Sequence, residues 1–148
     1  MAAATSRKAK SRSQAGKVGI LSYEHVGIRV SDRTRALAFY AGLGFHEEID
    51  HAGSPSKAVE IVNEHGLRIN LICNGEPQRG ARNVLQDDPR KLPGITHIAF
   101  AVDDLDVAMN YVRTSGLRIT EGPKELPRRR YFFFRDPDGN VIELNEYL

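Results

Sequence analysis

Two histidines and one glutamate have the residue types of a small metal site. His25 and His97 stand at the start of short alternating stretches, YEHVGIRVSD and ITHIAFAVDDLD, and Glu143 lies in a third stretch, NVIELNEYL. Neutral imidazole nitrogens and a carboxylate suit Zn, Ni, Mn or Fe(II) as ligands. A lone histidine on a strand is more often a hydrogen-bonded surface residue. The metal interpretation therefore depends on where the fold places the three side chains.

An internal repeat gives the two histidines equivalent positions. When the chain is shifted against itself by 72 residues, His25 falls on His97. The register continues with Asp32 on Asp104, Gly44 on Gly116 and, at an offset of 73, Gly66 on Gly139. A register that holds through a strand, a helix and a later turn predicts a duplicated unit.

Each copy has the pattern of a β-α-β-β-β module. An alternating strand is followed by an Asp cap and a short helix that ends at glycine. Further strands are expected at 45–51, 58–63 and 67–73, and then at 117–121, 130–135 and 140–147. The fold class is therefore α+β, with two tandem βαβββ modules at 22–74 and 95–148 and a Pro- and Gly-rich linker at 75–94.

The alternation of the strands assigns each candidate ligand to one face of its sheet. In each first strand the apolar residues must pack under the helix, so the residues between them face the other side, called here the open face. By this parity His25 and Arg29 lie on the open face of the first sheet. His97 and Glu143 lie on the open face of the second. Small neighbouring residues leave room there for a ligand.

Composition limits the classes of function. The formal charge is +2, but residues 1–21 carry five Lys or Arg and no acid, so the remainder has a net charge of −3. A mildly acidic body does not favour nucleic-acid binding. Residues 1–21 are expected to be a disordered basic tail, and residues 22–148 one domain. The single cysteine, Cys73, and the lack of an apolar run of membrane length lead us to expect a cytoplasmic protein without membrane contact.

Residues 22–148 resemble the vicinal oxygen chelate superfamily of glyoxalase I, fosfomycin-resistance thiol transferases, extradiol dioxygenases and bleomycin-resistance proteins. The matching segments are YEHVGIRVSD, AFYAGLGF, ITHIAFAVDDLD and YFFFRDPDGNVIELNEY. The resemblance implies paired modules that form a cup-shaped, partly open mixed sheet around one divalent ion. It implies His25, His97 and Glu143 as its ligands, and a homodimer. Whether the cup forms within one chain or between swapped chains stays open.

One position departs from the pattern of glyoxalase I. The repeat aligns Asn70 with Glu143, where glyoxalase-like sites typically have a second carboxylate. An amide is a poor ligand and cannot act as a base, so Asn70 is expected to orient water or substrate. Glu60 is a nearby substitute, but we interpret it as an ordinary edge-strand charge.

The resemblance favours a glyoxalase-like lyase or isomerase that acts on a small substrate chelated through vicinal oxygens, with Glu143 as the base. An extradiol-type dioxygenase suits the two-histidine, one-carboxylate set, but Phe133 stands where its signature has a tyrosine. A fosfomycin-type thiol transferase is a further candidate, and so is a ligand-binding protein of the bleomycin-resistance kind that catalyses no reaction. The presence of the ligand set weighs against this ligand-binding protein.

A basic run precedes the strand expected at 130–135. The stretch PRRRY contains Arg128, Arg129 and Arg130, and guanidinium groups bind carboxylates or phosphates well. We therefore expect at least one of them to reach the mouth of the cup and bind an anionic substrate, with Arg128 and Arg130 as the candidates beside Arg29. A solvated loop is the competing interpretation.

Overall fold

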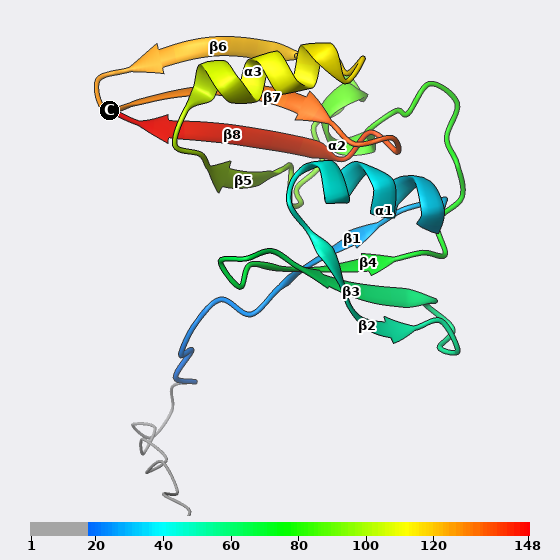
Figure 1. The fold of residues 1–148 in the computed structure, drawn as a ribbon. Helices are drawn as coiled ribbons and strands as arrows, with labels where there is room; N and C mark the ends of the chain where they lie inside the picture. Colours follow the sequence, from blue (N-terminus) through cyan, green and yellow to red (C-terminus); the bar gives the residue numbers. More distant parts are fainter. Residues whose placement is uncertain (1–17) are drawn as a thin grey trace, which may run out of the picture.

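The computed structural model describes residues 18–148, which form two copies of one unit (Figure 1). Module 1 comprises β1 (Val26–Arg29), α1 (Arg33–Gly42), β2 (His46–His51), β3 (Ala58–Val62) and β4 (Arg68–Ile72). Module 2 comprises β5 (Ile98–Ala101), α3 (Leu105–Thr114), β6 (Glu121–Leu126), β7 (Arg129–Arg135) and β8 (Val141–Tyr147). The predicted α+β class with two tandem βαβββ modules is confirmed.

Each module contains one four-stranded mixed sheet. The strand orders are β1-β4-β3-β2 and β5-β8-β7-β6, and in each sheet the first strand runs parallel to the last while the other pairs are antiparallel. The registers set Gly27 beside Asn70 and Ala99 beside Glu143. Within residues 18–148 no strand of one sheet pairs with a strand of the other, so neither sheet closes on its partner.

Aspartate caps start both long helices, as the sequence predicts. The side chain of Asp32 accepts a hydrogen bond from the backbone N–H of Arg35, and that of Asp104 accepts one from Val107. An N-cap of this kind satisfies a backbone donor that the first helical turn leaves unpaired. The caps mark where each helix begins, four residues after the last residue of the first strand of its module.

Both sheets turn their helix-covered faces toward one shared core, and α1 lies between them (Figure 1). Phe39 and Tyr40 of α1 reach module 2: the ring of Phe39 lies 6.1 Å from that of Phe134, and the Tyr40 hydroxyl donates to Asp136 at 3.1 Å. Tyr40 and Phe134 are fully buried. Because the helix-covered faces meet, the open faces of the two sheets point away from this core.

Two expectations about elements are corrected. The strand predicted at 117–121 instead spans Glu121–Leu126, because Leu117 and Ile119 pack against the core as part of a connecting segment. The linker contains a short helix, α2 (Val84–Asp87), which was not expected.

The basic tail predicted for residues 1–21 lies mostly outside the described residues, which begin at Val18. Within the described part, no helix combines the length and apolar character that crossing a membrane requires.

Candidate metal-binding and substrate-binding face

His97 and Glu143 meet on the open face of module 2. Nε2 of His97 lies 2.9 Å from a carboxylate oxygen of Glu143. Glu143 is buried, whereas about a third of the His97 side chain is exposed. His97 directly precedes β5, and Glu143 sits opposite Ala99 in the neighbouring strand β8. The parallel β5–β8 pairing therefore brings together two residues that lie far apart in the sequence.

Aromatic rings from β7 form a wall beside this pair. The ring of Phe133 meets His97 edge-on, with centroids 5.3 Å apart, and meets Tyr131 at 5.8 Å. Phe133 is also the direct β-sheet neighbour of Glu143. Together these residues line a cavity of about 470 Å³ that is open to solvent. Its surface combines apolar rings with a carboxylate and an imidazole.

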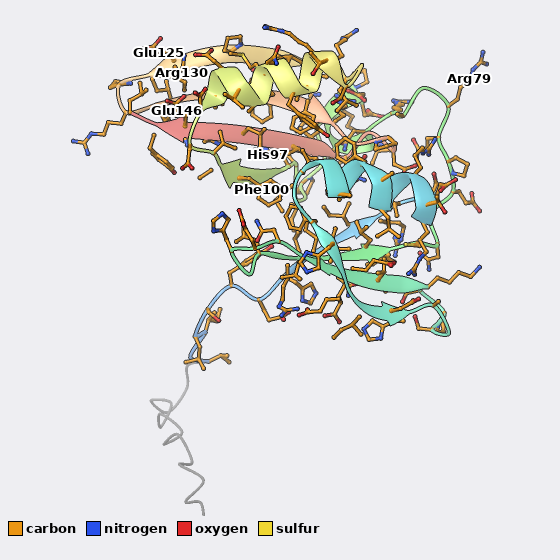
Figure 2. The ribbon with its side chains drawn as sticks, viewed as in Figure 1. Arg79, His97, Phe100, Glu125, Arg130 and Glu146 are labelled. Atoms are coloured by element: carbon orange, nitrogen blue, oxygen red, sulfur yellow. The ribbon has the colours of Figure 1, made fainter. Side chains whose placement is uncertain are left out.

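The three arginines of PRRRY have different surroundings. Arg129 lies on the open face, with its guanidinium 5.4 Å from the centre of the Tyr131 ring, and lines the same cavity as His97. Arg130 is on the other side of β7, where it bonds to Glu146 at 2.7 Å and to Asp106 of α3 at 3.2 Å (Figure 2). Arg128 is exposed in the turn between β6 and β7.

The expectation for Arg130 is therefore corrected. Residues alternate between faces along a strand, and Arg130 shares its face with the buried rings of Phe132 and Phe134. Arg129, which was one of the three arginines considered but was not named as a candidate, lies on the open face instead. The run FFF gives no alternation of polar and apolar residues, so the sequence alone did not show which of the arginines lies on the open face.

A second arginine of the open face is already neutralised. The guanidinium of Arg135 binds both carboxylate oxygens of Asp87 in α2, at 2.6 and 2.7 Å. This bidentate contact lowers the pKa of Asp87 strongly. Within residues 18–148, Arg129 has no ion-pair partner, so it is the cation of this cavity that is available to an anion.

The open face of module 1 carries the remaining candidates. His25 is half exposed and contacts its neighbour Glu24, and Arg29 donates to the side-chain oxygen of Asn74 at 3.2 Å. Asn70 sits opposite Glu60, whose carboxylate lies 2.9 Å from Nε2 of His51. Glu60 thus lies on the open face of an inner strand, not on an edge strand as expected.

The three expected metal ligands are divided between the two open faces. Among residues 18–148, no group of three or more His, Cys, Asp or Glu side chains comes close enough to hold a metal ion. His97 and Glu143 form a pair of donors, while His25 stands with Glu24 on the other sheet.

Unpartnered oxygens support a ligand on both faces. The side-chain oxygens of Asn70 and Asn145 are buried and, in the described part of the chain, have no hydrogen-bond partner. Asn145 lies two residues from Glu143 along β8 and so shares its face. Buried polar groups normally have partners. The three side chains, two imidazoles and a carboxylate, suit a divalent ion, and the fold of one chain brings two of them, His97 and Glu143, together.

A comparison with known protein families assigns this chain to a superfamily. The family model described as "Glyoxalase/Bleomycin resistance protein/Dioxygenase superfamily" matches residues 22–144. The chain belongs to this superfamily. The match covers module 1, the linker and module 2 as far as Leu144.

Proteins similar to this chain differ in their named roles. A glyoxalase domain-containing protein of Mycosarcoma maydis, RDO1, is 26% identical over 90% of this chain and 73% of its own length. The metallothiol transferase FosB of Staphylococcus epidermidis is 25% identical over 85% of this chain and 82% of its own. The crystal structure of TnmS3, an antibiotic binding protein from Streptomyces sp. CB03234, has a TM-score of 0.65 at 26% identity, covering 86% of this chain and 98% of TnmS3.

Proposed function

We propose that this chain is a metal-dependent, glyoxalase-like enzyme whose site is the open face of module 2, completed by His25 of a second copy. The contact between His97 and Glu143 carries the proposal, because it sets an imidazole and a buried carboxylate side by side in an open cavity. These two residues and His25 would hold one divalent ion of the Zn, Ni, Mn or Fe(II) kind.

The need for a second copy follows from the packing of the modules. The open faces point outward, so one chain separates His25 from His97 and Glu143. The outer edges of β1 and β5 have no strand partner in the described residues. Beside them Tyr23 and Ile95, two residues before each histidine, expose 66% and 80% of their surface. A homodimer that joins module 1 of one chain to module 2 of the other would cover these groups and bring the histidines together.

The residues around the pair suit a small anionic substrate. A bound divalent ion would supply Lewis-acid polarisation of substrate oxygens. In this proposal Glu143 would hold or receive a proton beside the substrate carbon, and Arg129 would bind an anionic group of the substrate. The rings of Tyr131 and Phe133 would exclude water from one side.

Two reactions compete for this site. A glyoxalase-type isomerisation or lyase reaction uses Glu143 as base. Thiol transfer is the second candidate, favoured by the similarity to the metallothiol transferase FosB and by Asn70, which provides no second carboxylate. Assaying the purified protein with the methylglyoxal–glutathione adduct, and with fosfomycin plus a thiol, separates the two. A ligand-binding protein that catalyses no reaction would convert neither substrate.

Metal content tests the shared site directly. We expect wild type to bind one divalent ion per chain, and both His25→Ala and His97→Ala to lose most of it, measured by elemental analysis after dialysis. Refolding the two variants together in equal amounts should restore about a quarter of the wild-type content, because in a swapped dimer one site of each mixed pair has both histidines.

The control for the mixing experiment is His65→Ala. The side chain of His65 is 76% exposed, lies in the β3–β4 turn and should leave metal content unchanged. If the metal content does not recover when the two variants are refolded together, the swapped dimer is contradicted. Full metal occupancy in both single variants would contradict the ligand assignment itself.

A further inference from the structure

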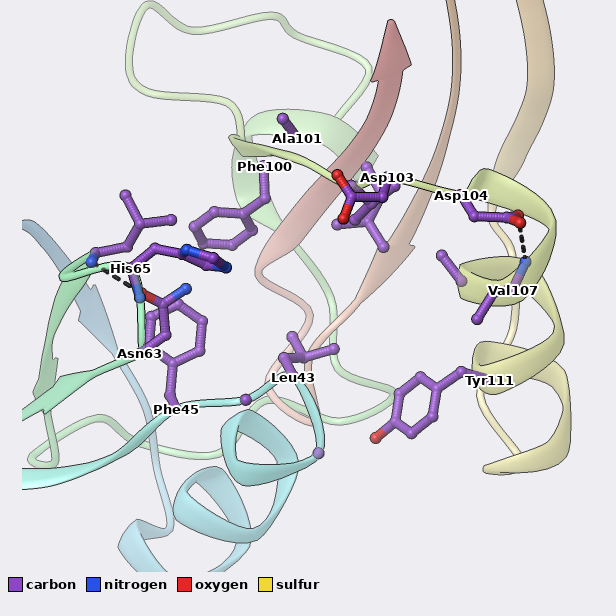
Figure 3. A pocket seen from close by; sticks show the side chains of 16 residues that line it. Leu43, Phe45, Asn63, His65, Phe100, Ala101, Asp103, Asp104, Val107 and Tyr111 are labelled. Atoms are coloured by element: carbon purple, nitrogen blue, oxygen red, sulfur yellow. Dashed lines mark hydrogen bonds between the residues drawn. The ribbon is translucent and has the colours of Figure 1, made fainter.

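A second cavity lies between the modules, on the helix-covered side of the sheets (Figure 3). It has a volume of about 540 Å³, within the range of roughly 300–1,000 Å³ common for small-molecule sites. Module 1 contributes the end of α1 and the β3–β4 turn, and module 2 contributes β5 and one side of α3 as far as Tyr111. Junctions between packed units are frequent places for ligand binding.

The walls of this groove are mostly apolar. The side chains that form them are Leu43, Phe45, Phe100, Val107, Ala108 and Tyr111. The end of α1 and the Tyr111 ring fit closely, because a Cβ added to Gly42 would lie 1.9 Å from the Tyr111 hydroxyl oxygen. Phe45 and Phe100 pack against each other across the modules, with ring centres 5.8 Å apart. The two modules thus hold the shape of the groove jointly.

One carboxylate at the rim is not used by the fold. Asp104 caps α3, accepting from the backbone N–H of Val107 at 2.9 Å. Its neighbour Asp103 is exposed and, within residues 18–148, makes no side-chain hydrogen bond or ion pair. Figure 3 shows Asp103 between Phe100 and the start of α3, at the edge of the apolar walls. A negative charge beside an apolar groove is complementary to an apolar molecule that carries a cation.

We propose that this groove is a second binding site, for a flat apolar molecule with one primary ammonium group that pairs with Asp103. The site is separate from the proposed metal face. Leu144 of β8 lines the groove, whereas the preceding residue, Glu143, faces the other side of the sheet. The two sites could therefore be filled at the same time.

Nuclear magnetic resonance titration of the full chain tests this site. The probes are naphthylmethylamine, naphthylmethanol, which has the same shape without charge, and naphthoate, which carries the opposite charge. We expect the amine to shift the backbone amides of Val107 and Ala108 and to bind more tightly than the alcohol. Naphthoate should not shift these amides.

Two variants locate the contacts. Asp103→Asn should weaken amine binding by about two- to fivefold, the range of partly exposed ion pairs, whereas Glu125→Gln removes the same charge from β6 and should have no effect. Ala108→Phe should abolish binding by filling the groove, with the melting temperature as a check on folding. Equal binding of the amine and the alcohol, or shifts centred on His97 and Tyr131, would overturn the proposal.

Discussion

Adjacent arginines in PRRRY have different surroundings because they belong to a β-strand. Arg130 stabilises the docking of α3 through Asp106 and Glu146, while Arg129 faces the cavity beside His97. The faces of His25, His97 and Glu143 could be predicted because their apolar neighbours define the buried side. Arg129 could not be separated from Arg130 with the same ease, because the arginines precede the apolar part of the strand.

Arg129 is expected to decide the affinity for anions. In the metal-loaded protein, Arg129→Met should weaken phenylphosphonate binding about tenfold, because a charge-assisted hydrogen bond to the anion is lost. Isothermal titration calorimetry measures the change, and elemental analysis should show unaltered metal content. Arg128→Met, in the exposed turn, is the matched control. Equal losses of phenylphosphonate affinity in both variants would show that the anion responds to the overall charge of the protein and not to a contact with Arg129.

Asn70 offers a test of the missing carboxylate. Its side-chain oxygen is buried and has no partner in the described residues, and it lies opposite Glu60. Asn70→Glu should tighten metal binding about tenfold or more by adding an anionic donor, and should lower the melting temperature of the metal-free protein because two carboxylates become neighbours. Competition with a chelator measures the first effect, and Asn70→Gln is the uncharged control. Unchanged metal affinity would place Asn70 outside the ligand shell.

At the scale of secondary-structure elements, the sequence predicts strands best where apolar residues alternate with other residues. His25 and His97 directly precede β1 and β5, whose apolar residues at every second position are buried or partly buried, and that pattern locates these two strands. In β8, which contains Glu143, the first five residues are all buried, so the internal repeat locates this strand and alternation does not. β6 has the sequence EGPKEL with every residue exposed, so no burial pattern marks it. The four-residue α2 lies in a segment whose prolines and glycines favour a loop.

The contact between α2 and β7 predicts a dependence on pH. Arg135 lowers the pKa of Asp87 in the folded protein, so the ionised carboxylate contributes stability above its unfolded pKa of about 3.9, and this contribution is lost as the pH falls. Asp87→Asn should cost about 0.5–1 kcal/mol at pH 7, a value that allows for solvent exposure of the pair. Urea unfolding should show this difference narrowing between about pH 5 and pH 2.

The control for this titration is Glu76→Gln, an exposed position in the linker that should give no pH-dependent difference. A gap between wild type and Asp87→Asn that stays constant down to pH 2 would mean that the carboxylate does not act through its ionised form.

At the scale of the whole molecule, the sequence pattern does not predict how the two modules pack against each other. Alternation identifies the buried face of each sheet but does not say which other surface covers it. The contacts that decide it, such as Phe39 with Phe134 and Tyr40 with Asp136, join side chains about a hundred residues apart. We therefore expect the two modules to unfold as one cooperative unit.

Tyr40→Phe tests that cooperativity. Burial and the nearby Asp136 carboxylate raise the pKa of Tyr40, so its hydroxyl stays protonated and donates at neutral pH. Removing it should cost about 1–3 kcal/mol, because a buried acceptor of Asp136 loses a donor. Calorimetry should still show one transition, with equal calorimetric and van't Hoff enthalpies. Tyr147→Phe, at an exposed position, should change neither quantity. Two separate transitions would contradict a shared core.

Strand β8 separates the groove between the modules from the cavity on the open face of module 2. Glu143 belongs to one compartment and Leu144 to the other, and their peptide bond is common to both. A ligand that displaces this backbone from either side changes the binding free energy of the ligand on the opposite side. Thermodynamic reciprocity then fixes the outcome: the factor by which a metal ion alters the affinity of an amine in the groove equals the factor by which the amine alters the affinity of the metal.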